Sequence, residues 1–128
     1  MKRLRLTQQK GAYRIQAEAL LVGSDLVVSI WGGSKPHVGA VALATPRPSL
    51  RDSAVASSTS SVLTRLGHKE DEIVKKVSER VAAALNSVVV VSAGIHWDDI
   101  SDEGIHTIDA ICEVLTDRLI VRILEKTQ

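Results

Sequence analysis

Aromatic side chains are almost absent from this chain of 128 residues. There is no phenylalanine, and the aromatic residues are Tyr13, Trp31 and Trp97. A chain of this length is large enough for one domain with one core, which must then be built from Val, Leu, Ile and Ala. Each tryptophan stands at the edge of a strand-like run, beside a candidate motif. It either caps the core, with its indole N–H bonded locally, or forms part of a binding surface.

Cysteine and long apolar runs are equally scarce. Cys112 is the only cysteine, which excludes an internal disulfide and a thiolate-rich metal site. It falls on the apolar face of a predicted helix, where we expect it to be a small buried hydrophobe. No run reaches the length needed to cross a bilayer, and the N-terminus lacks the apolar segment of a signal peptide. We therefore expect a cytoplasmic protein without a membrane partner.

An excess of charge of one sign is also missing. The formal net charge is +1, with 16 Lys and Arg against 15 Asp and Glu, so the electrostatic footprint of a nucleic-acid partner is absent. The short basic cluster at Lys2, Arg3 and Arg5 is interpreted as the exposed face of a strand. No repeat or linker divides the chain, and we expect residues 1–128 to form a single domain.

The first half of the chain has the two-residue alternation of β-strands. The pattern predicts strands over residues 2–9, 12–22, 26–31 and 38–44. Gly23-Ser24 is a hairpin signal between the second and third, and the nearly continuous apolar run of the fourth predicts burial on both faces. Regular structure is expected to end at Pro46-Arg47-Pro48. Residues 49–61 are rich in Ser, Thr and Ala, which predicts a mobile loop or a loop leading into a short strand over 61–64.

The second half has the 3.6-residue period of amphipathic helices on either side of a buried strand. A helix is predicted over about residues 70–85, a central strand over 88–91 that ends at Ser92-Ala93-Gly94, and a last helix from 101 or 102 to 124. This order indicates an α+β fold, with one mostly antiparallel sheet covered by two helices. Two helices cover only one face of a sheet. The other face is then polar or buried by a partner, and we expect a homo-oligomer.

Three of the four histidines stand in short phrases that contain glycine, where the hydrophobic pattern starts or stops. The phrases are Lys35-Pro36-His37-Val38-Gly39, Leu66-Gly67-His68-Lys69-Glu70 and Ala93-Gly94-Ile95-His96-Trp97. An imidazole beside a glycine at the end of an element presents a titratable donor to a ligand, with the backbone close by. The three phrases make a site only if their elements end at one place in the fold.

Each phrase also has a purely structural interpretation. Gly67-His68-Lys69 precedes a helix N-terminus, and the free N–H groups there favour the binding of a phosphate. The acidic residues that follow already satisfy the helix dipole, which favours ordinary helix capping instead. His96 with Asp98 or Asp99 is an oriented acid, base or ligand donor; alternatively, Asp99 caps the last helix and His96 bonds a backbone carbonyl. His37 starts a strand, where a histidine is more often structural than a ligand.

The spacing of these residues offers no support for a metal centre or a nucleophile. His37, His68 and His96 lie on separate segments, without a His-x-His or His-x-x-x-His pair. The serines from Ser57 to Ser61 have no nucleophile elbow, and the single cysteine has no local partner. We therefore predict neither a metal ligand nor a catalytic residue.

Five phrases stand in order within residues 36–105. They are Pro36-His37-Val38-Gly39-Ala40-Val41-Ala42, Pro46-Arg47-Pro48-Ser49, Ser60-Ser61-Val62, Gly67-His68-Lys69-Glu70-Asp71 and Gly94-Ile95-His96. Together they resemble the LpdD-like family, the small D component associated with gallate-type hydroxyarylic acid decarboxylases, which is described as a prenylated-flavin chaperone. The fold of that family is similar to that of the small proteasome-assembly chaperones.

The resemblance implies a non-catalytic accessory protein. Such a protein would bind prenylated FMN, or FMN itself, and deliver it to the large subunit of a prenylated-flavin-dependent decarboxylase. The implied cofactor-binding residues are His37, Gly39, Arg47, His68, Lys69, Gly94, His96 and Trp97, with basic and backbone donors on the phosphate and Trp97 or Trp31 against the ring. Two alternatives stay open. One is a general protein-assembly chaperone without a small-molecule ligand, and the other is a small enzyme with His96 or His68 as general base.

Overall fold

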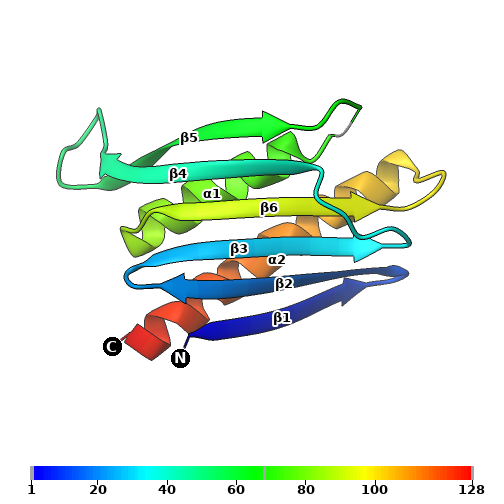
Figure 1. Cartoon of the computed structure of the whole chain (residues 1–128), viewed down its shortest axis with the longest axis horizontal. Helices are drawn as coiled ribbons and strands as arrows, with labels where there is room; N and C mark the ends of the chain where they lie inside the picture. The colour runs from blue at the N-terminus through cyan, green and yellow to red at the C-terminus, as the bar shows by residue number, and fades with distance from the viewer. Residues whose placement is uncertain (1, 68, 128) are drawn as a thin grey trace.

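The protein is built from one six-stranded sheet and two helices. The computed structural model describes residues 2–67 and 69–127. The elements are β1 (Arg3–Lys10), β2 (Tyr13–Val22), β3 (Asp25–Gly33), β4 (Ala40–Pro48), β5 (Ala56–Thr64), α1 (Asp71–Leu85), β6 (Val89–His96) and α2 (Asp102–Thr127). The strands lie in the order β1-β2-β3-β6-β4-β5 (Figure 1). Among these described strands only β3 and β6 run parallel, and the other neighbours are antiparallel.

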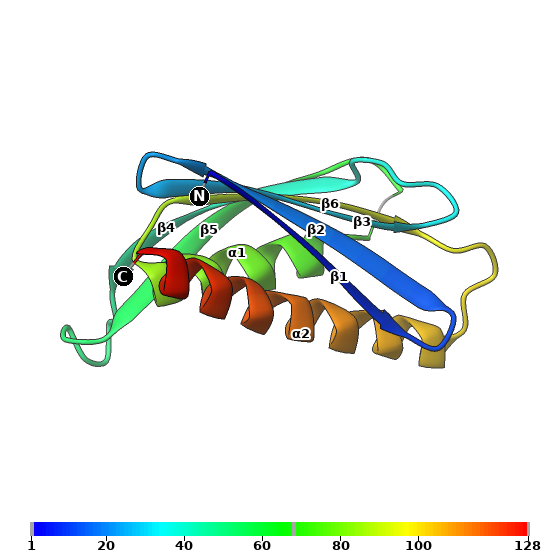
Figure 2. The same cartoon turned by 90° about the horizontal axis from the view of Figure 1, so that it is seen from below.

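Both helices lie on the same side of the sheet. Figure 2 shows the sheet as one layer and α1 and α2 as a second layer beneath it. The opposite side, which we call the open face, carries no element of the described chain and faces the viewer in Figure 1. The predicted α+β class, with a mostly antiparallel sheet and two covering helices, is confirmed.

The core is aliphatic, as the shortage of aromatic residues requires. Alternate residues of each inner strand point toward the helices and are fully buried, for example Ile15, Ala17 and Ala19 of β2. From α2 the buried stripe is Ile108, Ile111, Cys112, Leu115, Leu119 and Ile123. The three buried alanines of β4 leave room for the backbone of α1 to approach that strand.

The ends of the helices follow local backbone chemistry. Asn86 stops α1 in a left-handed conformation (φ 51°), and its N–H donates to the carbonyl of Ala82. At the start of α2, the hydroxyl of Ser101 accepts a hydrogen bond from the N–H of Gly104 at 3.0 Å. The cap of the last helix is therefore Ser101, and the interpretation of Asp99 as that cap is wrong.

Three predicted boundaries are wrong. β4 continues through Pro46-Arg47-Pro48, β5 begins at Ala56 rather than near residue 61, and β6 runs on through Gly94 to His96. The prolines are tolerated because β4 pairs with β6 only as far as Ala44, and beyond that residue its sole neighbour among the described strands is β5. A proline fits a strand where one side has no ladder partner.

The prediction that the fourth strand is buried on both faces is also wrong. Ala40, Ala42 and Ala44 are buried against the helices, but Val41 is only half-buried and Leu43 is 46% exposed on the open face. The apolar run therefore serves two different faces of the sheet: the alanines pack against the helices, and Val41 and Leu43 lie on the uncovered open face. Neither of the two described helices is long and apolar enough to cross a membrane.

Candidate functional site

Two of the three histidine phrases lie at the same end of the sheet. The loop from β3 to β4, residues 34–39, crosses the carboxyl end of β6 on the open face (Figure 1). It is tied there by two hydrogen bonds, from the N–H of Ser34 to the carbonyl of His96 (2.9 Å) and from the N–H of Gly39 to the carbonyl of Ala93 (2.8 Å). The expectation that these phrases stand at element ends is correct for His37 and His96. His68 lies outside the described residues.

The imidazole of His37 is held inside this corner of the protein. Its Nε2 lies 2.9 Å from Oε1 of Glu70, and its Nδ1 lies 2.8 Å from the carbonyl oxygen of Lys35. Both ring nitrogens face acceptors, and a ring nitrogen that carries a proton donates to the oxygen beside it. The Glu70 carboxylate is buried and also accepts from the N–H groups of Ile95 (3.3 Å) and Lys69 (3.2 Å). This arrangement connects β6, the crossing loop and the start of α1.

The two glycines of this corner allow the backbone to approach closely. A Cβ at Gly94 would overlap the carbonyl group of His37, and a Cβ at Gly39 would overlap the carboxylate of Glu70. The glycines are therefore explained by packing between the crossing loop, β6 and Glu70. The structural interpretation of the first phrase accounts for the close approach at Gly39 and for the contacts of the His37 imidazole with Glu70 and Lys35.

His96 is accessible. Its Nε2 lies 2.9 Å from Oδ1 of Asp98, and its side chain is 42% exposed. The hydrogen bond from His96, together with the positive charges of Lys35 and His96, lowers the pKa of Asp98 below its usual value. The prediction that His96 pairs with Asp98 or Asp99 is thus correct for Asp98, and the alternative in which His96 bonds a backbone carbonyl through its ring has no support in the described contacts.

Beside His96, the two tryptophans line a shallow cleft that we call the indole cleft. Its volume is about 300 Å³, and its walls are Arg14, Gln16, Trp31, Gly32, Gly33, Pro36 and Trp97. Gly33 is the register partner of His96 on the neighbouring strand, which places the imidazole next to the cleft. Three separate segments, β2, the end of β3 with its loop, and the end of β6, converge here.

Aromatic and cationic contacts hold both indoles in place. The ring of Trp97 packs edge-on against Tyr13, with centroids 5.1 Å apart and an interplanar angle of 81°. The guanidinium of Arg5 lies 5.3 Å from the ring centroid of Trp31, within the range of a cation–π contact. We expected each tryptophan either to cap the core or to form part of a binding surface. Trp97 does both, since it packs against the core and also lines the cleft.

Arg14 is the residue of this cleft that the sequence analysis missed. It stands at the start of β2, between the half-buried Tyr13 and the buried Ile15, and faces the open side of the sheet. A basic residue in an alternating strand looks like ordinary solvated surface. Only the pairing of β2 with β3, which sets Ile15 opposite Gly32, reveals that Arg14 borders the tryptophans.

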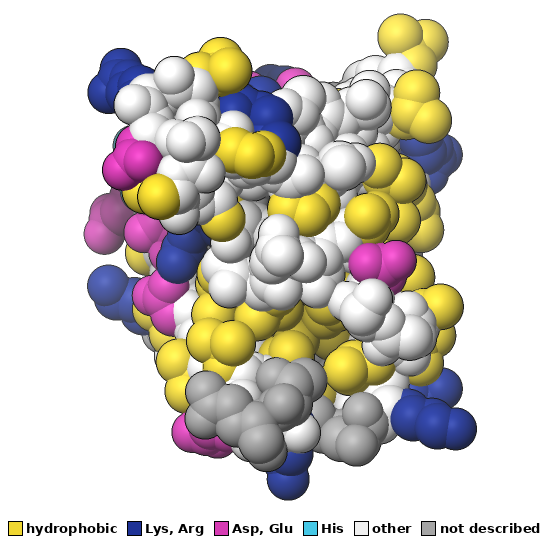
Figure 3. Space-filling view, turned by 90° about the vertical axis from the view of Figure 1, so that its left-hand side faces the viewer, with side chains coloured by type: hydrophobic (Ala, Val, Ile, Leu, Met, Phe, Trp, Pro, Cys, Tyr) yellow, Lys and Arg dark blue, Asp and Glu magenta, His cyan; other side chains and the backbone are white. Residues whose placement is uncertain are grey.

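The structure does not bring all the predicted cofactor-binding residues together. Arg47 lies near the far end of β4, where its Nε donates to the hydroxyl of Thr59 (2.7 Å) and its Nη1 to the carbonyl of Pro48 (3.0 Å). Figure 3 shows that end of the molecule, and no histidine is visible on it. Lys69 is at the same end as His37 and is exposed. A single pocket holding Arg47 together with His37 and His96 is therefore incompatible with the fold.

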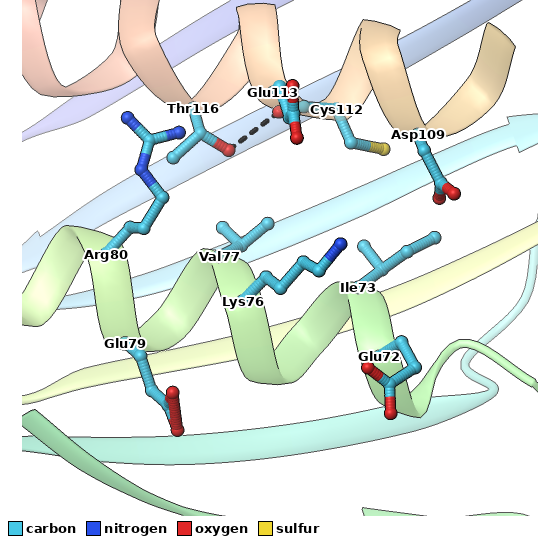
Figure 4. Close-up of a pocket in the computed structure, with 10 residues that line it drawn as sticks. All are labelled: Glu72, Ile73, Lys76, Val77, Glu79, Arg80, Asp109, Cys112, Glu113 and Thr116. Atoms are coloured by element: carbon cyan, nitrogen blue, oxygen red, sulfur yellow. Dashed lines mark hydrogen bonds between the residues drawn. The ribbon is translucent and has the colours of Figure 1, made fainter. Parts of the chain in front are cut away.

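A second hollow lies between α1 and α2, on the helical side (Figure 4). It measures about 350 Å³, with Ile73, Val77 and Cys112 on its floor and charged side chains at its rim. Burial raises the pKa of the Cys112 thiol to about 12, so the thiol is not a nucleophile at neutral pH. The groove is an ordinary helix–helix seam. The expectation of a small, buried hydrophobe at Cys112 is confirmed.

Among the described residues, no group of three or more His, Cys, Asp or Glu side chains is arranged to hold a metal ion. The groups in or beside the indole cleft include two indoles, the guanidinium of Arg14, the imidazole of His96 and the backbone at Gly33. These groups suit a flat, anionic organic ligand, since the indoles offer apolar faces and Arg14 offers a fork of donors for a carboxylate or a phosphate.

Comparison with known proteins gives three findings. The family described as "Prenylated flavin chaperone LpdD-like domain" matches residues 9–124. Protein LpdD of Lactiplantibacillus plantarum is 25% identical over 116 residues, which span 89% of this chain and 80% of LpdD. A chain from the crystal structure titled as a novel chaperone complex for yeast 20S proteasome assembly superimposes with a TM-score of 0.54 at 13% identity, covering 93% of this chain and 96% of that one. The last likeness concerns the fold alone.

Proposed function

Because the chain belongs to the LpdD-like family of prenylated flavin chaperones, we propose that it binds prenylated FMN, or FMN itself, in the indole cleft and delivers it to a partner decarboxylase. Family membership makes the protein an accessory chaperone rather than an enzyme. The observation that carries the flavin proposal is the convergence of Trp31, Trp97 and Arg14 around one cleft.

The cleft suits the ring of a flavin better than the whole nucleotide. Its volume of about 300 Å³ lies at the lower end of the range for small-molecule pockets. The flat ring system can lie on an indole face, and the ribityl phosphate then extends out of the cleft. Trp97 is braced by Tyr13, so little side-chain freedom is lost when a ring stacks there.

The phosphate would lie at the rim, where the positive groups are. Arg14 lines the cleft directly, and a guanidinium recognises a phosphate with two parallel hydrogen bonds. His96 follows on the neighbouring strand, and Lys35 is close enough to lower the pKa of Asp98.

The proposal changes the roles given to the residues from the sequence. Trp97, His96 and Gly94 stay at the site or beside it. His37 and Gly39 act indirectly, by fixing the loop that carries Pro36 into the wall of the cleft. Arg47 has no role in this cleft.

The two tryptophans make the test direct, because both indoles of the chain line the cleft. Titration with FMN should quench their fluorescence, and calorimetry should give the same dissociation constant. Arg14→Ala should weaken binding by about 10- to 100-fold, the value of a charge-assisted hydrogen bond of ~1.5–3 kcal/mol. Arg51→Ala, on the exposed β4–β5 loop, is the matched control and should bind like the unmodified chain. Equal affinity of the two variants, or no quenching at all, would contradict the proposal.

Delivery is tested separately from binding. The flavin-loaded chain is mixed with the cofactor-free large subunit of a prenylated-flavin-dependent decarboxylase, and the two proteins are separated by gel filtration. Flavin should move to the decarboxylase fraction faster than it does from free solution. Transfer at the same rate with and without the chain would leave the protein a flavin binder without a delivery function.

A protein-assembly module without a small-molecule ligand is the second candidate. The observation that favours it is the open face of the sheet, which carries exposed Leu20, Val27 and Leu43 and resembles a surface made for another protein. This candidate predicts no FMN binding. It also predicts that Arg14→Ala leaves association with the decarboxylase unchanged.

A further inference from the structure

The two edge strands of the sheet differ in how their outer side is protected. β1 and β5 are the outermost strands (Figure 1). β1 carries Arg3, Arg5 and Lys10, and Nη1 of Arg118 in α2 donates to the carbonyl of Thr7 at 2.8 Å. Charged side chains and a covering element are the usual means by which an edge strand is kept from pairing with another chain. The β1 edge is therefore blocked.

The β5 edge has none of these protections. Residues 56–64 contain no charged side chain and no proline. Within the described part of the chain, no element lies beyond β5 and no side chain bonds its backbone (Figure 1). An uncovered edge of this kind presents a row of N–H and C=O groups on which another chain can add a strand.

The register of the β4–β5 pair shows which backbone groups of β5 face outward. The pair is antiparallel, and one step beyond its last register position the N–H of Arg65 donates to the carbonyl of Gly39 at 2.9 Å. Hydrogen-bonded and non-hydrogen-bonded positions alternate along an antiparallel pair. The residues that bond β4 are therefore Ser57, Thr59, Ser61 and Leu63. The residues whose N–H and C=O point away from the sheet are Ser58, Ser60 and Val62.

The β1 edge provides a check on this alternation. There the N–H of Leu21 donates to the carbonyl of Lys2 at 2.8 Å, one step beyond the register of β1 with β2. Counting from this pair places the backbone of Thr7 on the outer side. Its carbonyl is the one that Arg118 bonds from outside the sheet. The same counting therefore identifies outward groups correctly at the other edge.

The free edge is held in place from the helical side. The hydroxyl of Ser58 donates to the carbonyl of Glu79 at 2.7 Å, and that of Ser60 donates to Oε2 of Glu79 at 2.6 Å. Nζ of Lys75 lies 3.3 Å from the other oxygen of the same carboxylate. Since α1 already fixes this strand in its extended form, little conformational freedom is lost in β5 when a further strand pairs with it.

We propose that an extended segment of the partner decarboxylase adds to β5 as a further strand of the sheet, bonded by the outward groups of Ser58, Ser60 and Val62. The inference rests on the proposed function, because it names the surface through which the flavin-carrying chain meets its partner. The outward residues recur every ~6.8 Å along the edge, the two-residue repeat of a strand. Only another extended backbone matches such a row of donors and acceptors.

The charges beside β5 favour a partner segment over a second copy of this chain. The stretches on either side of the strand, residues 47–55 and 65–69, hold four basic residues and one acidic residue. The basic residues are Arg47, Arg51, Arg65 and Lys69, and the acidic one is Asp52. Two copies paired through β5 would bring these positive stretches together, which is unfavourable. A segment with an uncharged centre and acidic flanks complements them.

A proline at the outward position 60 tests the pairing. Ser60→Pro and Ser60→Ala both lose the hydroxyl that reaches Glu79, but only the proline removes the outward N–H. That N–H does not bond β4, so the proline costs no hydrogen bond of the ladder. Binding to the immobilised, cofactor-free large subunit should be at least 10-fold weaker for Ser60→Pro than for Ser60→Ala. Thr7→Pro, at an outward position of the blocked edge, should bind like the unmodified chain.

FMN titration keeps this inference separate from the proposed function. Position 60 lies outside the indole cleft, so all these variants should bind FMN with the affinity of the unmodified chain. Equal binding of Ser60→Pro and Ser60→Ala to the large subunit overturns the β5 inference alone. The same holds if the unmodified chain does not bind the large subunit although it binds FMN. Failure of the proposed function instead appears as an unmodified chain that binds no FMN.

Hydrogen exchange tests the pairing in the unmodified chain, residue by residue. When the large subunit is added, exchange of the outward N–H groups of Ser58, Ser60 and Val62 should slow at least 10-fold. The N–H groups of Thr59 and Ser61 already bond β4 and should change much less. Uniform slowing along β5, or none, overturns strand addition. Slowing of the outward groups in the chain alone, growing with its concentration, overturns the decarboxylase as occupant and assigns the edge to a second copy.

Discussion

His37 and the buried Glu70 form a pair, Nε2 to Oε1 at 2.9 Å, that joins the loop between β3 and β4 to the residue that precedes α1. The carboxylate also accepts two backbone N–H groups, one of them from Ile95 in β6. Three parts of the chain, the crossing loop, β6 and the start of α1, therefore meet at one side chain. The pair itself does not line the indole cleft, but it determines where Pro36 stands in the wall of that cleft.

Removal of this carboxylate should destabilise the protein. Glu70→Ala removes the acceptor of the His37 ring and of two backbone N–H groups, and the expected loss is about 2–4 kcal/mol of unfolding free energy. Glu70→Gln keeps one acceptor oxygen and should lose less. Urea denaturation measures both. Glu72→Ala, exposed in the first turn of α1, is the control and should change stability by no more than about 0.5 kcal/mol. A Glu70→Ala variant as stable as this control would show that the pair contributes nothing.

The same corner predicts a large difference between two glycine substitutions. In Gly94→Ala the new methyl group meets the backbone carbonyl of His37, which cannot move without displacing the crossing loop. We expect a loss of about 3 kcal/mol or more. In Gly23→Ala the methyl group meets nothing within 4 Å, and only the left-handed backbone (φ 61°) is strained, at about 1–2 kcal/mol. Thermal unfolding of the two variants gives the comparison, and equal losses would contradict the close approach.

The fold was largely predictable because the hydrophobic periods are strong. The two-residue alternation around Ile15 and the helical stripe through Leu115 each have one face that the core must bury. The weak points were the positions where composition misleads. Proline at position 46 predicted an end to the strand, since the sequence does not show that β4 loses its β6 neighbour after Ala44.

The candidate site was less predictable because its members meet only through tertiary pairing. Arg14 becomes a cleft residue when β2 pairs with β3, and no local signal marks it. Arg47 and His37 were joined in one predicted site only by the family resemblance, since they stand near opposite ends of one strand. Arg47 lies in β4, seven residues beyond Ala40, which corresponds to roughly 23 Å along the strand, so it is far from the end of the sheet where His37 lies.

The Asp98 carboxyl should titrate at a pH below the usual range for aspartate. The hydrogen bond from His96 is the main cause of its lowered pKa, followed by the charges of Lys35 and His96. NMR titration of the carboxyl carbon should therefore show the pKa of Asp98 rising toward 3.8 in His96→Ala. Lys35→Ala should raise it by a smaller amount. Because the carboxyl is exposed, neither change should alter stability measurably. A pKa that does not respond to His96→Ala would show that the pair does not form in solution.

The Cys112 thiol gives the pH dependence of stability a definite sign. Burial raises its pKa from 9.0 to about 12, so between these values the unfolded chain has lost the thiol proton and the folded chain has kept it. Unfolding then releases a proton, and stability falls as pH rises above 9, by up to about 1.4 kcal/mol per pH unit. Cys112→Ala should show a shallower fall between about pH 9 and 10.5 than the unmodified chain. Lysine and tyrosine residues also titrate in this range, but they affect both proteins equally and cancel when the two slopes of stability against pH are subtracted. Identical slopes for Cys112→Ala and the unmodified chain would contradict the raised pKa. At about pH 8 the same burial should make the folded thiol react with a disulfide reagent at least ~100-fold more slowly than the thiol in urea.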